Sequence, residues 1–180
     1  LEREGDEAAF KTSESGRARA LVEAMARAGR DVFGLAAPEL GRVQEELGHT
    51  AALVSYRFVD DDLYAFVVTG DSIATHRLGV DREEISTRVS ALVDLLAKDD
   101  DEAWRPITRR LGSTLIEPWL ASIGSGVTSL WLVPDGALFD LPFEVLATES
   151  HPGFLLESYE ISYLPAVALL GVHEKPATES

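Results

Sequence analysis

The chain has 180 residues, a net charge of −15, a hydrophobic share of 46% and no cysteine. This length suits one ordinary domain or a domain with an appendage, and the hydrophobic share is typical of a globular chain with a core. The acidic balance argues against direct contact with nucleic acid or an anionic membrane surface, because phosphate groups are bound by clustered Lys and Arg.

Membrane insertion and secretion are not indicated either. No apolar run approaches the roughly 18 residues of a membrane span, and residues 1–10 lack the basic region and apolar core of a signal peptide. The absence of cysteine fits a reducing compartment, and we expect a cytoplasmic protein, although many secreted bacterial proteins also lack cysteine. It also means that this chain holds no thiol nucleophile.

The amino-terminal part predicts helices. Small and apolar side chains recur at three- and four-residue steps over residues 17–28, with charged residues on the opposite face. Gly16 predicts an interruption ahead of that helix, so that any helix near Phe10 is short. A second helix is predicted over residues 39–47, with Gly48 as its stop.

The hydrophobic period then changes to that of strands. Residues 51–59 alternate and are rich in aromatic and β-branched side chains, and residues 63–69 and 72–78 continue the pattern. The acidic run 60–62 and the dipeptide at 70–71 provide short turns between them. The three segments therefore predict an antiparallel β-meander.

Two helices are predicted after the meander. Asp81 and Glu84 have the spacing of a capping box and begin a helix that runs to about Lys98. The next helix carries Pro106 in its first turn, and Pro118 should kink or end it. The first of these helices is expected to bury Ile85, Val89, Leu92, Val93 and Leu96.

Residues 129–146 (SLWLVPDGALFDLPFEVL) are the stretch around which the chain is organised. The apolar run 130–133 predicts a strand buried on both faces. Residues 134–136 (Pro-Asp-Gly) break it with turn chemistry, and residues 137–139 resume the apolar run.

Further elements follow this turn. Asp140 can cap a short helix over residues 141–146 that carries Pro142 in its first turn. Residues 159–164 predict another strand, and Pro165 begins a last helix that extends to about Val172.

The sequence contains no recognisable motif for a metal site, a serine hydrolase or an EF-hand. The four histidines lack the spacing of a metal site, so structural or exposed roles are expected for His49, His76, His151 and His173. Gly124-Ser125-Gly126 lacks the G-x-S-x-G spacing and precedes a strand, which argues against a serine hydrolase. The acidic runs 60–62 and 99–102 are interpreted as solvated turns because neither has EF-hand spacing. Neither a cofactor nor a metal is expected.

Residues 129–146 resemble the entry to the CHAT domain, a caspase-like cysteine peptidase domain related to separases. The resemblance continues over residues 154–166 (FLLESYEISYLPA), where the family typically shows an aromatic-apolar pair, a tyrosine, an Ile-Ser-Tyr strand and a Pro-Ser. Ala166 stands where that serine is usual. The resemblance covers about residues 50–172, and its motifs are apolar and structural.

The resemblance implies an incomplete α/β domain, in which an antiparallel β-meander and helices precede the first strands of a caspase-like sheet. Residues 1–48 would be a helical linker and residues 49–180 the amino-terminal portion of the peptidase domain. The helix over residues 17–28 is similar to the last helix of a tetratricopeptide array, which often precedes CHAT domains. An ordinary amphipathic surface helix explains it equally well.

The family acts through a His-Cys dyad, whose two residues would both lie beyond Ser180. The resemblance therefore implies no catalytic residue in this chain, which alone should be inactive. Expected partners are the remaining carboxyl-terminal half, a protein or peptide substrate, and a regulatory protein acting through helical repeats. The alternative is a catalytically inactive CHAT-like interaction or scaffold module.

Four residues are candidates for the site. Asp135 follows the carboxyl end of a predicted strand, where sites of parallel sheets gather, and could recognise a cationic substrate side chain as acidic residues do in related peptidases. An Asp-Gly turn formed for its geometry alone is the alternative. Glu144 is expected to anchor a helix or loop in support of the site. Pro142 and Phe143 should be buried, which would hold the turn against the sheet.

Overall fold

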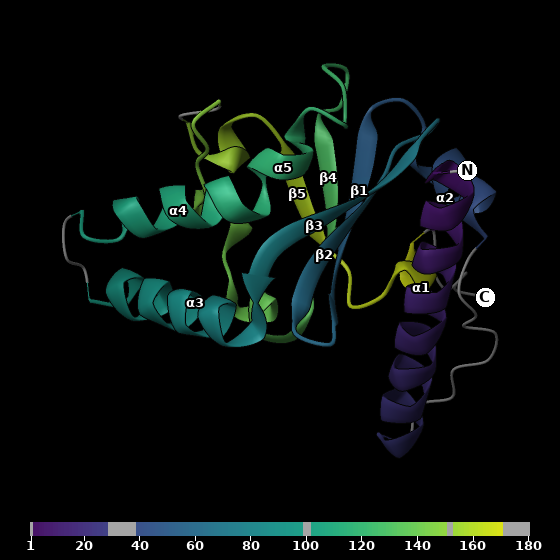
Figure 1. Cartoon of the computed structure of the whole chain (residues 1–180), viewed down its shortest axis with the longest axis horizontal. Helices are drawn as coiled ribbons and strands as arrows, with labels where there is room; N and C mark the ends of the chain where they lie inside the picture. The colour runs from purple at the N-terminus through teal and green to yellow at the C-terminus, as the bar shows by residue number, and fades with distance from the viewer. Residues whose placement is uncertain (1, 29–38, 99–101, 151–152, 171–180) are drawn as a thin grey trace, which may run out of the picture.

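The computed structural model describes residues 2–28, 39–98, 102–150 and 153–170. These residues form a mixed α/β fold around one five-stranded sheet with the order β3-β2-β1-β4-β5 (Figure 1). The strands are β1 (Ala51–Val59), β2 (Asp62–Val68), β3 (Ile73–Asp81), β4 (Ser129–Val133) and β5 (Glu160–Tyr163).

Helices cover both faces of the sheet (Figure 1). The α-helices are α1 (Glu2–Arg27), α2 (Leu40–Leu47), α3 (Arg82–Leu96), α4 (Arg105–Leu115) and α5 (Glu117–Leu120). Helices α1 and α2 lie on one side, and α3, α4 and α5 lie on the other. Short 3-10 helices precede and follow β5 along the chain, namely η1 (Gly136–Asp140), η2 (Phe143–Val145), η3 (Leu155–Glu157) and η4 (Val167–Leu169).

The predicted β-meander is confirmed, because β1, β2 and β3 pair antiparallel in sequence order. The second half of the chain joins the other side of β1. Strand β4 pairs parallel with β1, with Ser129 opposite Ala51, and β5 pairs parallel with β4. The apolar run 130–133 therefore forms an interior strand, as its composition predicts.

Strand β1 supplies side chains to two cores. Val54 and Tyr56 belong to the larger core, under α3, α4 and α5, whereas Leu53 belongs to the smaller one, under α1 and α2. All three side chains are fully buried, as expected for a strand covered on both faces. Because α1 and α2 share a core with the sheet, the division of the chain at residue 48 stays a prediction.

The expected interruption at Gly16 is wrong, since α1 runs unbroken through it. Phe10 is buried, and its ring centroid lies 6.1 Å from that of Phe66 on β2. This packing of α1 on the sheet outweighs the cost of about 1 kcal/mol that glycine imposes on a helix interior. Of the predicted stripe in residues 17–28, Ala18 is buried and Ala28 is exposed.

The predictions for residues 137–146 are wrong in their elements. Residues 137–139 belong to η1 and do not resume a strand, because Gly136, at a φ of 56°, turns the chain directly after β4. Asp140 ends η1 and caps no helix. Only one 3-10 turn follows, because a residue before proline favours extended backbone, and Leu141 has a ψ of 119° ahead of Pro142.

The structure confirms the predicted start of α3 and the predicted break near Pro118. The Asp81 carboxylate accepts a hydrogen bond from the Glu84 backbone N–H at 2.8 Å, which caps α3. Pro118 lies in the first turn of α5, and the break between α4 and α5 precedes it. The predicted burial of Val93 and Leu96 is wrong, because the last turns of α3 extend beyond the sheet (Figure 1) and both side chains are exposed.

The final predicted elements are shorter in the structure. The strand predicted over residues 159–164 is β5, and Ala166 is fully buried beside it. The helix expected from Pro165 is the 3-10 turn η4 in the described residues. Residues 171 and 172, where that helix was expected to continue, lie outside the described residues.

One glycine sets how closely α4 approaches the segment after η2. A Cβ added at Gly112 would lie 2.0 Å from the backbone oxygen of Ala147. We expect Gly112→Ala to lower the free energy of unfolding by about 1–3 kcal/mol, since the two backbones must separate. Urea denaturation of both forms measures this change.

Gly16→Ala is the matched control, because a Cβ there meets nothing within 4 Å. It should raise the free energy of unfolding by roughly 0.5–1 kcal/mol through helix propensity. If Gly112→Ala stabilised the protein as much as this control, the close approach would be refuted.

Candidate functional site

The candidate site lies at the edge of the sheet where the parallel strands β1, β4 and β5 end. Because these strands run in the same direction, their carboxyl ends at Val59, Val133 and Tyr163 share one edge. Ligands of open α/β sheets bind outside this edge. Asp135, the residue singled out by sequence, lies two residues after the end of β4.

Asp135 joins the loop after β4 to the end of β1. Its Oδ2 accepts a hydrogen bond from the Phe58 backbone N–H at 3.0 Å, and its Oδ1 lies 3.8 Å from Nη1 of Arg57. The side chain remains 21% exposed. The carboxylate thus has partners within the chain as well as an open side, and its role in binding a cationic substrate stays a prediction.

A buried ion pair from α1 reaches the same strand ends. Arg17 is 7% exposed and Glu14 is 1% exposed, with 3.5 Å between Arg17 Nη1 and Glu14 Oε1. Arg17 Nη1 donates to Ser55 Oγ at 3.1 Å and to the Val133 backbone oxygen at 3.4 Å. Its Nη2 donates to the backbone oxygen of Tyr56. The guanidinium therefore bridges β1 and the last residue of β4.

Glu14 completes this buried network. Its Oε1 accepts from the Ser55 hydroxyl at 2.7 Å, and its Oε2 accepts from the Val167 backbone N–H at 3.3 Å. Burial lowers the pKa of Arg17, while the carboxylates of Glu14 and Asp135 oppose that shift. Arginine keeps its charge in proteins, so a cation is held permanently beneath the loop that carries Asp135.

The residues expected to support the site gather around β5. Phe143 is fully buried, with its ring centroid 5.3 Å from Tyr56 and 6.2 Å from Tyr163, and Pro142 is half-buried. The Tyr163 hydroxyl donates to Glu144 Oε2 at 2.7 Å and accepts from the Phe143 backbone N–H at 3.1 Å. Burial, and then the Glu144 carboxylate, raise the pKa of Tyr163. Glu144 thus connects η2 to β5, and its supporting role at a site stays a prediction.

The structure places these candidates in two separate groups. Among the described residues, no hydrogen bond or ion pair joins Asp135 to Pro142, Phe143 or Glu144. Sequence reasoning missed the Glu14–Arg17 pair altogether. Its signal was the i,i+3 spacing of opposite charges, which becomes meaningful only if the helix continues through Gly16.

The histidines that the structure describes form no metal site. His76 Nε2 lies 3.1 Å from Ser122 Oγ, and partial burial lowers the pKa of His76 against the opposing charge of Asp6. His49 is exposed, whereas His151 and His173 lie outside the described residues. Within the described ranges, no group of three or more His, Asp or Glu could hold a metal ion.

The first acidic run forms the turn between β1 and β2. Asp60 has a φ of 54°, and Asp62 accepts two hydrogen bonds of 2.8 Å from the guanidinium of Arg77. Residues 99–101 of the second run lie outside the described residues. None of the helices that the structure describes has the length and apolar content of a membrane span.

A family model of the CHAT domain matches residues 105–180. The matched part begins at α4 and contains β4, β5 and the turns between them, including Asp135 and Glu144. The match supports a CHAT domain, a family related to caspase-like peptidases, over this part of the chain. No curated protein matches the chain.

The Glu14–Arg17 pair makes a testable contribution to stability. Arg17→Met leaves the Glu14 carboxylate buried without its cation, so we expect a loss of about 3–5 kcal/mol in the free energy of unfolding. Replacing both residues, as Glu14→Gln with Arg17→Met, should recover part of this loss. Urea denaturation of the single and double variants measures both effects.

Arg27→Met serves as the control on the same helix. It breaks the Arg27–Glu23 pair, whose side chains are 79% and 58% exposed, and should cost at most about 1 kcal/mol. A loss at Arg17 no larger than the loss at Arg27 would show that the Glu14–Arg17 pair does not secure α1 to the sheet.

Proposed function

We propose that this chain is the amino-terminal portion of a caspase-like cysteine endopeptidase whose His-Cys dyad lies in polypeptide that follows it. The observation that carries the proposal is the CHAT family match over residues 105–180, which includes the interior parallel strand β4 and the Pro-Asp-Gly turn at its carboxyl end. The absence of cysteine from this chain requires the thiol to come from elsewhere.

The outer edge of β5 is where we expect strands of the following polypeptide to join the sheet. Among the described residues it pairs with β4 alone, so its outer edge is open. Parallel sheets are usually covered on both faces and extended by further strands through crossover connections. Strands carrying the dyad would pair along β5, and their carboxyl ends would meet the same edge as Asp135.

In the proposed reaction, the cysteine thiolate attacks the scissile carbonyl carbon of a protein or peptide substrate. The histidine takes the thiol proton and returns it to the leaving amine, and water then hydrolyses the acyl-enzyme. Asp135 would bind a cationic substrate side chain from its exposed side. Glu144 and Phe143 would hold η2 against β5 below the substrate. A reducing compartment such as the cytoplasm would suit both the thiol nucleophile and the cysteine-free chain.

Regulation would act through α1. We propose that α1 continues a helical-repeat region, and that a protein bound to the repeats changes the position of α1 on the sheet. Arg17 contacts the backbone of Val133, two residues before Asp135, so such a change would reach the substrate-binding loop directly.

The proposal is tested by peptide cleavage. The complete protein should cleave peptide substrates, and iodoacetamide should abolish this activity because it alkylates the catalytic thiol. Residues 1–180 alone should be inactive under the same conditions. Cleavage by residues 1–180 alone, or cleavage that survives both alkylation and replacement of the downstream cysteine, would overturn the proposal. A complete reading frame without that cysteine would instead support the scaffold alternative.

Specificity is tested by Asp135→Asn in the complete protein. The amide still accepts the Phe58 N–H but carries no charge, so kcat/KM for peptides containing Arg or Lys should fall about 10-fold relative to neutral peptides. Glu144→Gln, which keeps an acceptor for Tyr163, should affect both peptide classes equally. Unchanged selectivity in Asp135→Asn would remove the role of Asp135 and leave the peptidase proposal standing.

A further inference from the structure

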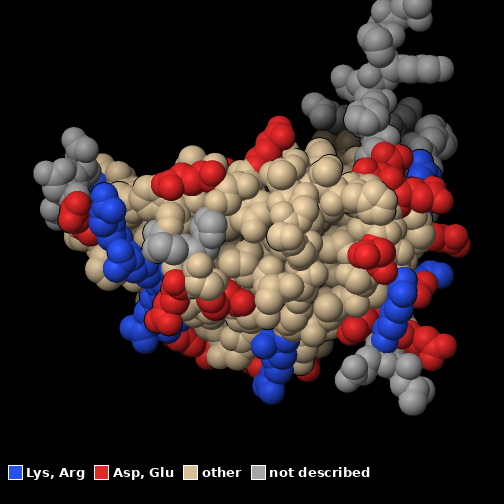
Figure 2. Space-filling model, turned by 90° about the horizontal axis from the view of Figure 1, so that it is seen from above, with Lys and Arg blue, Asp and Glu red and all other residues tan. Residues whose placement is uncertain are grey.

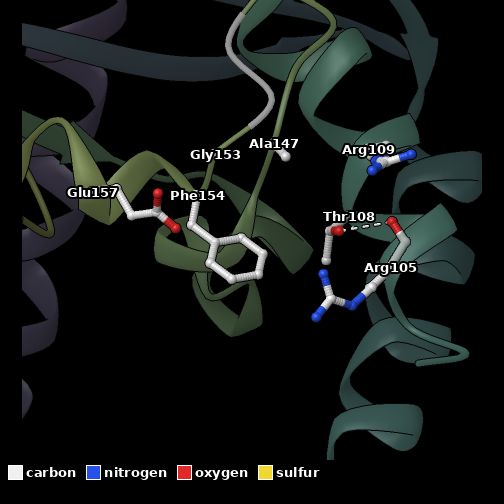
Figure 3. A pocket seen from close by; sticks show the side chains of 7 residues that line it. All are labelled: Arg105, Thr108, Arg109, Ala147, Gly153, Phe154 and Glu157. Carbon is white, nitrogen blue, oxygen red and sulfur yellow. Dashed lines mark hydrogen bonds between the residues drawn. The ribbon is translucent and has the colours of Figure 1, made fainter. Parts of the chain in front are cut away.

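A cavity of about 120 Å³ lies between α4 and the segment that leads to β5 (Figure 3). It shares no residue with the site at the strand ends. Two guanidinium groups, one aromatic ring and one carboxylate dominate its lining, which consists of Arg105, Thr108, Arg109, Ala147, Gly153, Phe154 and Glu157.

The cavity has a cationic wall and an aromatic wall. In Figure 3, α4 presents Arg105, Thr108 and Arg109 from one side, and the guanidinium of Arg105 points toward the ring of Phe154. The Phe154 ring lies 5.8 Å from that of Trp104, which fixes it against α4. The Glu157 carboxylate lies beyond the Phe154 ring in the same view.

The positions of the α4 arginines carry an electrostatic cost, which the ring of Trp104, 5.2 Å from the guanidinium carbon of Arg105, offsets in part. Arg105 and Arg109 are four residues apart on a helix, where like charges repel. Arg105 is also the first residue of α4, whose first turn contains no acidic residue, although the positive end of the helix dipole disfavours a cation there.

Ion pairs within the chain compensate little of this cost. Arg105 lies 3.3 Å from Glu102, but both side chains are about half exposed or more, so the pair contributes little. Among the described residues, Arg109 and Arg110 form no ion pair. This is notable in a chain with 31 acidic and 16 basic residues, where acidic partners are plentiful. An anion placed between the arginines would relieve the repulsion.

A second cavity extends the first along α4. It has a volume of about 560 Å³, and Arg109 lines both cavities together with Arg110 and Ser113 of the same helix in the second one. Thr148 and Glu149 form its other wall. Figure 2 shows Lys and Arg side chains gathered at the end of the molecule that α3 and α4 form. We refer to these two neighbouring cavities, which share Arg109, as the groove.

We propose that this groove binds an extended peptide segment of a partner protein through one Glu or Asp side chain followed by an apolar residue. The peptide carboxylate would lie between Arg105 and Arg109, since guanidinium groups bind carboxylates with paired hydrogen bonds. The apolar residue would pack on Phe154. The proposal goes beyond the peptidase function and does not depend on it.

The surrounding charge selects against other anions. Glu149 and Glu157 line the groove beside the arginines, and the whole chain carries a net charge of −15. A long polyanion such as nucleic acid or an acid-rich tail would be repelled outside the arginine pair. A single carboxylate avoids this repulsion, and Glu157 can accept a hydrogen bond from a backbone N–H of the same peptide.

The probe for this proposal is the blocked dipeptide acetyl-Glu-Phe-amide, titrated into the 180-residue chain and followed by amide NMR. We expect saturable shifts at Arg105, Thr108, Arg109 and Phe154, with a dissociation constant in the millimolar range for so small a ligand. Acetyl-Gln-Phe-amide should bind about 10-fold more weakly, because it lacks the charge.

Variants assign the interaction to the arginines. Arg109→Gln should weaken binding of the Glu peptide about 10-fold, and Arg105→Gln is the second variant in the same cavity. Arg19→Gln is the matched control, since it makes the same charge change at an exposed position of α1. Unshifted resonances of β1 verify that each variant is folded.

Several results would overturn the proposal. They are equal binding of the Gln and Glu peptides, equal weakening by Arg19→Gln, and no saturable shift up to about 10 mM peptide. Inorganic phosphate is titrated as a separate arm. If phosphate bound at the same residues as tightly as the Glu peptide, the groove would be a general anion site and the peptide assignment would be wrong.

Discussion

The parallel pairing of β4 with β1 is the interaction on which the remaining structure depends. It joins residues 129–133 to the first strand of the meander, although β2, β3 and the helices α3, α4 and α5 lie between the two strands in the chain. It also makes β1 an interior strand, and because side chains of a strand alternate between the two faces of the sheet, those of β1 fill two cores. Without this pairing, the loop that carries Asp135 would not lie beside the end of β1.

The same pairing determines which backbone groups remain for other contacts. At the ends of the two strands, the Val133 and Tyr56 oxygens accept hydrogen bonds from Arg17, and the Phe58 N–H donates to Asp135. Buried backbone polar groups require partners. The strand ends are therefore completed by two charged side chains, one from α1 and one from the loop after β4.

Much of the fold was predictable because short stretches of sequence indicate its strands, turns and helix starts. The meander follows from alternating apolar residues and short acidic turns, and the start of α3 follows from the Asp81 cap. The extent of α1 was not predictable, since its amino-terminal half owes its stability to Phe10 and Glu14 beneath the sheet rather than to helix propensity.

The candidate site was likewise predictable only in part. The Pro-Asp-Gly turn after β4 drew attention to Asp135 in the sequence. Its contact with Phe58, 77 residues away in the chain, depends on the register of β1 and β4, which no local pattern encodes. Similarly, Arg105 and Arg109 look like ordinary surface residues of a helix. Only the fold shows that they line a cavity together with Phe154.

Among the residues that the structure describes, β5 has no neighbouring strand on its outer side, and this has a consequence for handling the protein in solution. Unpaired strand edges are templates for aggregation, and a charged side chain on such a strand disfavours pairing with another molecule. In β5 the charged residue is Glu160. At neutral pH the large negative charge keeps molecules apart, but it disappears near the isoelectric point of about 4.6. Mild acidification therefore removes the net charge that keeps molecules apart, and edge-to-edge pairing of β5 strands from two molecules becomes easier.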